Sequence, residues 1–335
     1  MRGDDLFDDL PRSTSAREAA APVTPAGRIR VEYGDFESLP ADTLCIVRGG
    51  GQPVSTAPLT IDVQLQRLAG PATELWYARG GVRAGRSGFV RYAHDDELLV
   101  GLVEEDERVC GGIQQTAETL YAAIRNFQQQ SEFRHLLRMW NYLDAINEGS
   151  GDTERYRQFC VGRALGLGKQ VGRLLPAATA IGRQQATHQL QIFWIATRAA
   201  GTAVENPRQV SAYHYPRAHG PVSPSFSRGM ITADRAVLVS GTASIVGHVS
   251  QHEGDEHAQL EETLRNIAAL TAHASARCGN VRHRNLLKVY VRDPALVPTI
   301  ATRLQEAYPD AAPPIFLAGD ICRRELLLEI ECMQL

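Results

Sequence analysis

The feature that most constrains this sequence is an internal repeat. Two stretches of about 110 residues follow the same predicted order: two strands, a helix, a strand, a second helix and two strands. The first stretch runs from about Arg86 to Thr197 and the second from about Phe226 to Cys332. Two copies of one α+β unit account for a chain of 335 residues better than two unrelated domains do.

The two copies match most clearly in one helix and the strand that follows it. Apolar residues recur every three or four positions over 113–130 and over 257–278, and this spacing predicts an amphipathic helix in each copy. The strand after the first helix reads LLRMWNY, and the strand after the second reads LLKVYVR. We therefore expect two mixed β-sheets, each with two helices packed on one face.

The rest of the chain suggests a simple division. Residues 1–27 are rich in Asp, Arg, Ser, Ala and Pro and show no periodicity, so we expect a flexible N-terminal tail. The remainder divides into an N-terminal domain, residues 28–205, and a C-terminal domain, residues 206–335.

Composition excludes several classes of function. The 35 Lys and Arg residues and 38 Asp and Glu residues leave a formal net charge of -3, which argues against a general nucleic-acid binder. No apolar run approaches the roughly 20 residues of a membrane-spanning helix, and the acidic start differs from a secretory signal. The six cysteines form no CxxC pair and none has a His at metal-ligand spacing. We expect a cytoplasmic protein with no nucleic-acid partner, no membrane partner and no metal.

The last strand, ELLLEIEC, carries two carboxyl groups on one face. Side chains alternate along a strand, so Glu329 and Glu331 point one way while Leu328 and Ile330 point the other. In a cleft, loss of water would raise the pKa of such a Glu and suit it to act as a general acid. The alternative is that the two Glu residues lie on a solvated outer face.

Three other segments could form a binding site. The loop over 212–229 contains Tyr213 and Arg217 among several prolines and glycines, which is a composition typical of binding loops and also of inter-domain connectors. The helical stretch ERYRQFCVGRALGL contains Arg157 and Arg163, which indicate a nearby anion unless they lie on the surface. In LVSGTASIVGH, Gly241 interrupts a strand, which suggests close approach of a ligand or a neighbouring subunit.

Taken together, these segments resemble the chorismatase family of chorismate-cleaving enzymes, which contain RidA/YjgF-like domains. The resemblance covers nearly the whole chain from about Arg28, and ERYRQFCVGR and YPRAHGPVSPSFSR are its most specific parts. The terminal LLLEIE is also similar to the last strand of RidA-like proteins, whose functional Glu falls on Glu329. The resemblance implies a tandem pair of RidA-like units, with the catalytic residues mainly in the C-terminal one.

The resemblance also implies an activity. Glu329 would protonate the methylene carbon of the enolpyruvyl ether of chorismate, and no metal or organic cofactor would be required. Arg157, Arg163, Tyr213 and Arg217 would bind the two carboxylates of the substrate. The first copy has no carboxylate in LQIFWIAT, so we expect one active cleft per chain, in a monomer or a small homo-oligomer.

Two positions bear on the product. Cys322 lies seven residues before Glu329, as in the family branch that forms 3-hydroxybenzoate, whereas Ala243 in the SGTAS segment resembles the hydrolytic branch. This mixed pair best fits the branch that resembles the bifunctional hydroxybenzoate synthases of pigment-producing bacteria. We therefore expect 3-hydroxybenzoate with some 4-hydroxybenzoate, and the alternative is hydrolysis to 3,4-dihydroxycyclohexa-1,5-dienoate.

Two functions outside chorismate cleavage are also open. A RidA-like protein could deaminate imines, but such proteins place an Arg about 15 residues before the terminal Glu, where this chain has Pro314. A non-catalytic module could instead bind an aromatic acid without converting it.

Overall fold

The computed structural model describes residues 29–50, 57–168, 175–279 and 284–335, and the predicted tail over 1–27 lies outside them. The five α-helices in the described ranges are α1 (Glu107–Cys110), α2 (Ile113–Gln130), α3 (Arg155–Leu167), α4 (Glu256–Cys278) and α5 (Val297–Ala307). The helix predicted over 113–130 is confirmed, and α4 begins one residue before the predicted 257.

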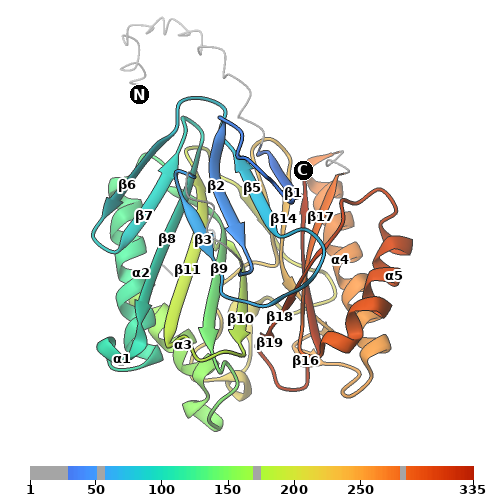
Figure 1. Cartoon of the computed structure of the whole chain (residues 1–335). Coiled ribbons are helices and arrows are strands. Elements are labelled where there is room, and N and C mark those ends of the chain that lie inside the picture. Colours follow the sequence, from blue (N-terminus) through green and yellow to red (C-terminus); the bar gives the residue numbers. More distant parts are fainter. Residues whose placement is uncertain (1–28, 51–56, 169–174, 280–283) are drawn as a thin grey trace, which may run out of the picture.

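Most strands belong to two seven-stranded sheets (Figure 1). The first sheet has the order β19 (Asp320–Ile321), β10 (Ala177–Arg183), β9 (His135–Asp144), β11 (Gln189–Thr197), β8 (Leu98–Asp106), β7 (Val90–His94), β6 (Arg83–Ser87). The second has the order β12 (Thr202–Val204), β13 (Gly229–Ile231), β14 (Val237–Thr242), β20 (Leu328–Gln334), β17 (Asn285–Val291), β18 (Ile315–Ala318), β4 (Arg67–Ala69). Both are mixed sheets, because β9 and β10 are parallel, as are β17 and β18.

Two smaller sheets complete the described part of the fold. A four-stranded sheet has the order β1 (Val31–Gly34), β5 (Thr73–Tyr77), β2 (Thr43–Arg48), β3 (Thr60–Asp62), and β15 (Ile245–Val246) pairs with β16 (Val249–Ser250). The four-stranded sheet precedes the first repeat in the sequence.

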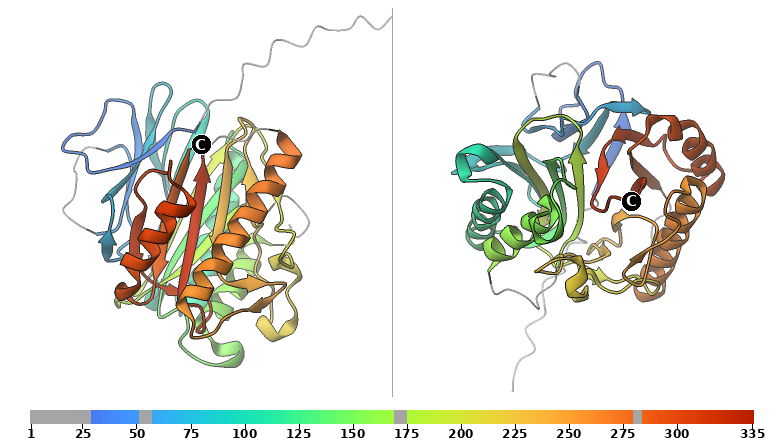
Figure 2. Two further views of the ribbon diagram at one scale, coloured as in Figure 1. Left: turned by 90° about the vertical axis from the view of Figure 1, so that its right-hand side faces the viewer. Right: turned by 90° about the horizontal axis from the view of Figure 1, so that it is seen from below.

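The sheets face a common centre and the helices lie outside them (Figure 2). Apolar side chains from the four-stranded sheet and both seven-stranded sheets form one central core, which includes Trp76, Trp140 and Tyr290. A second core lies between the first sheet and helices α2 and α3, and a third lies between the second sheet and helices α4 and α5. The predicted α+β class, with two helices on one face of each repeated sheet, is confirmed.

The two halves of the chain exchange short edge strands. Strand β4, from the N-terminal part, pairs with β18 of the second sheet, and β19, from the C-terminal part, pairs with β10 of the first. Strand β12 also joins the second sheet, although it precedes residue 206. Each exchanged strand covers a sheet edge that would otherwise expose unpaired backbone groups.

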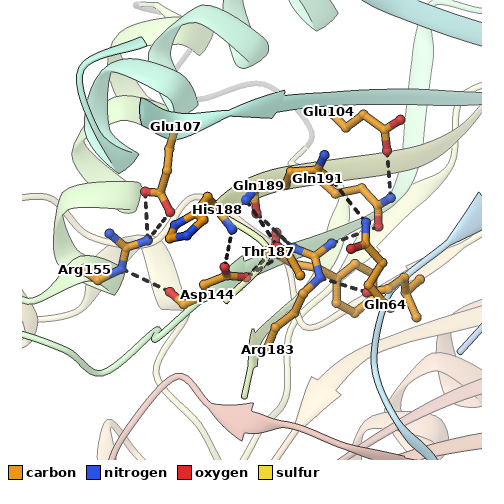
Figure 3. Close-up of polar contacts among 12 residues, drawn as sticks. Gln64, Glu104, Glu107, Asp144, Arg155, Arg183, Thr187, His188, Gln189 and Gln191 are labelled. Atoms are coloured by element: carbon orange, nitrogen blue, oxygen red, sulfur yellow. Dashed lines mark hydrogen bonds and ion pairs between the residues drawn. The ribbon is translucent and has the colours of Figure 1, made fainter. Parts of the chain in front are cut away.

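A polar network fixes the start of α3, which carries two of the predicted site residues. The guanidinium of Arg155, in the first turn of α3, donates to both oxygens of Glu107 and to the carbonyl of Asp144 (Figure 3). In the same network, Arg183 of β10 donates to backbone carbonyls that include those of Tyr142 and Gln189. These contacts tie α3 to the ends of the first sheet and so set the position of its other arginines.

No helix within the described ranges combines the length and apolar character required to cross a membrane.

Candidate active site

A cavity of about 190 Å³ lies where the two seven-stranded sheets meet. Strands β10 and β14 approach each other there, and the backbone N–H of Gly241 in β14 donates to the hydroxyl of Thr179 in β10 at 3.0 Å. The walls come from α3, β10, β14, β20, the loop over 215–228 and the segment over 322–326. The first repeat therefore supplies one side of the cavity and the second repeat supplies the other.

Glu329 lies inside this cavity and not on a solvated face. Glu329 is only 4% exposed, and its carboxyl group accepts no hydrogen bond from the described residues. Burial raises the pKa of Glu329 to about 8, and the negative charge of Glu331 adds to this, while Arg138 and Arg228 oppose it. At neutral pH the Glu329 carboxyl is therefore mainly protonated, which is the form that a general acid needs.

Gly241 allows β14 to pass close to this carboxyl group. A Cβ atom at position 241 would overlap the Oε1 atom of Glu329. The sequence pattern indicated close approach at Gly241 but suggested a ligand or a neighbouring subunit as the cause. In the structure, the approaching group is the side chain of Glu329.

Glu331, on the same face of β20, has the opposite surroundings. Its oxygens accept from Arg138 at 2.6 Å, from Trp140 at 2.8 Å and from Thr179 at 2.9 Å, and the Lys288 ammonium lies 2.9 Å away. Burial alone would raise the pKa of Glu331, but Lys288 and Arg138 hold it below the usual value. The two carboxyl groups of one strand are thus kept in different protonation states.

The two predicted arginines of α3 both line the cavity. Arg163 is only 3% exposed, and its Nε and Nη2 atoms have no hydrogen-bond partner among the described residues. Its guanidinium lies 5.1 Å from the centre of the Tyr121 ring. Arg157 is half-buried, and its Nε lies 3.8 Å from the carboxylate of Glu154. A buried guanidinium with unused N–H groups can bind an anion such as a carboxylate.

The structure does not bring Tyr213 and Arg217 to the cavity. Tyr213 is exposed and packs against the ring of His214, and Arg217 is exposed and pairs with Asp152 at 2.8 Å. These residues lie in two short 3₁₀ turns, Ala212–His214 and Arg217–His219, which the composition of the loop does not reveal.

Neighbouring residues of the same loop line the cavity instead. Tyr215 and His219 point into it, and the Tyr215 hydroxyl accepts from Arg228 at 2.5 Å. Arg228 is buried, and its Nε has no partner in the described part of the chain. All three residues are present in the motif that carries the family resemblance, so the motif located the loop but not the side chains that face inward.

The segment before β20 contributes two cations that the sequence analysis did not single out. Arg323 lines the cavity and donates to the Ser250 hydroxyl at 3.0 Å, and Arg324 lines it and donates to backbone carbonyls that include that of Gly149. The adjacent arginines in DICRRELLLEIE, directly after Cys322, were a signal that could have identified them.

Cys322 and Ala243, the two positions expected to bear on the product, are brought together with Glu329 in the cavity lining. Burial, with a smaller contribution from Glu329, raises the pKa of the Cys322 thiol to about 12. The thiol is therefore neutral and can act as a weak donor or a packing group, but not as a thiolate nucleophile. Among the described residues, no group of three or more His, Cys, Asp or Glu is arranged to hold a metal ion.

Comparison with known proteins gives consistent matches. The family model described as Chorismatase FkbO/Hyg5-like, N-terminal, matches residues 74–196. The "3-hydroxybenzoate synthase" of Streptomyces hygroscopicus is 36% identical over 285 residues, which are 78% of this chain and 81% of the relative. The "Chorismatase" of Streptomyces rapamycinicus is 34% identical over 275 residues, which are 77% of this chain and 80% of the relative.

The fold has a solved counterpart over almost its full length. A crystal structure described as chorismatase superposes with a TM-score of 0.78 at 29% sequence identity. The match covers 92% of this chain and 98% of the crystallised one.

Proposed function

Because the chain belongs to the chorismatase family, we propose that it cleaves chorismate and releases pyruvate, with Glu329 as the acid that starts the reaction. The observation that carries this proposal is a buried, protonated carboxyl group without a hydrogen-bond donor, which faces a cavity lined by arginines. An acid of this kind can deliver a proton to a carbon atom that is itself a weak base.

The cavity carries a surplus of positive charge that suits a substrate with two carboxylates. Arg157, Arg163, Arg228, Arg323 and Arg324 line it, and the acidic residues of the lining are Glu154, Glu325 and the protonated Glu329. We assign Arg163 to one substrate carboxylate, because its unused N–H groups are buried and oriented by the ring of Tyr121. Arg157 and Arg323 approach the same space and are the candidates for the other carboxylate.

The proposed first step is transfer of a proton from Glu329 to the methylene carbon of the enolpyruvyl ether. The π electrons of the vinyl group form the new C–H bond, and the ether oxygen stabilises the resulting oxocarbenium ion. Glu329 is left as a carboxylate close to this cation. Water adds to the cationic carbon and gives up a proton, and the resulting hemiketal breaks its bond to the ring oxygen to release pyruvate and the ring alcohol. Loss of one ring hydroxyl as water then gives the aromatic product. The carboxylate regains a proton before the next turnover.

The proposed product is 3-hydroxybenzoate, with or without 4-hydroxybenzoate. This outcome needs no net water, because chorismate contains all the atoms of one hydroxybenzoate and one pyruvate. A neutral Cys322 thiol beside the acid favours loss of the ring hydroxyl over simple hydrolysis. Ala243 favours the alternative, in which one water is consumed and the dihydroxycyclohexadienoate is released.

The test is incubation of the purified protein with chorismate alone. We expect one pyruvate per chorismate, and chromatography of the second product distinguishes hydroxybenzoates from the dienoate. Glu329→Gln, which keeps the shape of the side chain and removes the acid, should lower the rate at least about 100-fold. Glu306→Gln, on the exposed outer side of α5, is the matched control and should leave the rate unchanged. Normal turnover by the Glu329→Gln variant would refute the role of Glu329.

A further inference from the structure

Four charges are buried together behind the cavity. The Lys288 ammonium lies 2.6 Å from Glu74 and 2.9 Å from Glu331, and Arg138 donates to Glu331 at 2.6 Å. All four side chains are almost completely buried. They come from the four-stranded sheet (β5), the first seven-stranded sheet (β9) and the second seven-stranded sheet (β17 and β20). We call these four residues, Glu74, Arg138, Lys288 and Glu331, the central charge cluster.

The central charge cluster is neutral overall, because it contains two carboxylates and two cations. None of its four residues lines the cavity, but Glu331 lies two residues from Glu329 on the same face of β20. The backbone separation of such residues is roughly 7 Å, and both side chains are enclosed by protein, so water screens their charges weakly.

We propose that Glu331 is a positioning residue for the reaction: its charge, fixed by Arg138 and Lys288, opposes a second negative charge at Glu329 and so keeps that carboxyl in its acid form. This inference rests on the proposed function, because chorismate cleavage is the reason that Glu329 must hold a proton. It assigns a role to a residue that does not touch the substrate.

The other charged and titratable groups around Glu329 do not replace this contribution. Over all elements of the lining and β9, they are Arg138 of β9, Glu154 before α3, Tyr156, Arg157 and Arg163 of α3, Tyr215, His219 and Arg228 before β13, Cys322 after β19, and Arg323, Arg324 and Glu325 before β20. The arginines favour the ionised form of Glu329, which is the opposite of what the acid requires. Cys322 is neutral, and Glu325 is bound by the Ser250 hydroxyl at 2.6 Å. Glu331 is thus the anion that opposes the arginines at Glu329.

A purely structural role for Glu331 makes a different prediction. If Glu331 only joined the sheets, its loss would lower stability and reduce activity at every pH. An electrostatic role instead predicts shifts of the alkaline limb of kcat/KM whose direction depends on the sign of the charge removed. The pH profile therefore separates the two explanations.

The experiment compares Glu331→Gln, Lys288→Met and the double variant with the wild-type protein, using pyruvate release from chorismate. Glu331→Gln leaves a net positive cluster, so the alkaline limb should move to lower pH by at least about one unit. Lys288→Met leaves a net negative cluster, so the limb should move to higher pH by a similar amount. The double variant is neutral again, and its limb should return to within about 0.3 units of the wild-type position.

Two controls exclude effects that do not depend on charge. Tyr290→Phe removes a hydroxyl that donates to Glu331 at 3.3 Å, but no charge, and should leave the limb in place. Glu262→Gln removes a buried, ion-paired carboxylate from α4, outside the cavity, and should also leave it in place.

The outcomes are separable. No pyruvate from the wild-type protein refutes the proposed function itself. If the wild-type protein releases pyruvate but the alkaline limbs of the folded single variants stay in place or move in the same direction, the role of Glu331 is overturned. The proposed function then still stands. If Glu331→Gln does not fold, comparison of the double variant with Lys288→Met, which differ only at position 331, still decides the question: the limb of the double variant should lie at lower pH.

Discussion

The two repeats place opposite kinds of side chain at corresponding positions of their last strands. In the first repeat, Trp140 of β9 lies opposite Phe193 of β11, and the two rings stack 4.4 Å apart. In the second repeat, Tyr290 of β17 lies opposite Glu329 of β20. The matched strands LLRMWNY and LLKVYVR align Trp140 with Tyr290, so Phe193 occupies the place that Glu329 has in the second repeat.

The residue pairs two positions away on the same strands differ in the same way. Arg138 lies opposite Ile195 in the first repeat, and Lys288 lies opposite Glu331 in the second. At these two positions of its last strand, the first repeat has Phe193 and Ile195 where the second has the two Glu residues, and Arg138 instead donates across to Glu331 of the second repeat. At these positions the first repeat provides apolar packing and Arg138, and the second provides the two carboxyl groups of β20. A duplicated fold can divide a site between copies in this way without changing its backbone.

Substitutions at the two aligned positions, Phe193 and Glu329, should give the largest effects. Phe193→Ala removes a stacked ring from the central core and should lower the free energy of unfolding by about 3–5 kcal/mol. Glu329→Gln should leave that free energy almost unchanged, because the wild-type carboxyl is already neutral at pH 7, while turnover is lost. Denaturant unfolding and pyruvate release measure the two. Equal destabilisation by both variants would contradict the division of roles.

The glycines of matching strands sharpen the comparison. Gly101 of β8 faces the ring of Trp194, so Gly101→Ala should cost about 1–3 kcal/mol of stability through overpacking. Gly241→Ala should instead displace the Glu329 carboxyl and lower kcat about 10-fold or more. Melting temperature and kcat, measured on both variants, test the contrast. It fails if Gly241→Ala loses stability but keeps its kcat.

The second helices of the two repeats should also differ in effect. Arg163→Met on α3 removes a buried N–H donor for the substrate and should lower kcat/KM about 10–100-fold, mainly through KM. Arg303→Met on α5 removes a partly exposed guanidinium that pairs with Glu261, and should leave KM unchanged. Steady-state kinetics of both variants decide between a binding role and a general effect of losing an arginine.

The pH dependence tests the acid form of Glu329 directly. The reaction needs the protonated carboxyl, so kcat/KM should be constant below about pH 8 and fall about tenfold per unit above it. Cys322→Ala should keep this limb, because the pKa of that thiol is about 12. Burial lowers the pKa of His219 to about 4, so this histidine cannot produce a limb near pH 8. If the limb disappears in Cys322→Ala, the titrating group is the Cys322 thiol and not the Glu329 carboxyl.

The smallest effect should be seen in the product. Ala243→Gly enlarges the cavity by one methyl group beside Cys322, and we expect a change of a few-fold in the ratio of 3-hydroxybenzoate to the other products. Total pyruvate release should change less than this ratio. Chromatography of the aromatic fraction, with pyruvate as the internal measure, checks both statements.

The features that could be predicted from the sequence depend on local periodicity. The apolar spacing over 113–130 specified α2, and the alternation of ELLLEIEC placed Glu329 and Glu331 on one face. Strands as short as β4 and β19 have no such pattern, because two or three residues cannot show a period. Their pairing depends on sheet edges far away in the sequence.

The parts of the site that could not be predicted from the sequence were missed for the same physical reason. Glu331 and Arg138 are separated by 193 positions, and no local pattern specifies that they meet. In the loop over 212–229, two 3₁₀ turns direct Tyr213 and Arg217 outward and leave Tyr215 and His219 facing the cavity. The composition of a loop can identify a binding segment, but the inward direction depends on the turns.

The exchanged edge strands have a consequence for how this protein can come apart. Strand β19 pairs with the first sheet and is followed at once by Cys322, so the wall of the cavity is attached to both halves of the polypeptide. Strand β4 makes the reciprocal link. Neither half can loosen without opening the sheet of the other, and a polypeptide cut between the repeats would keep its chemistry only if the two pieces reassembled.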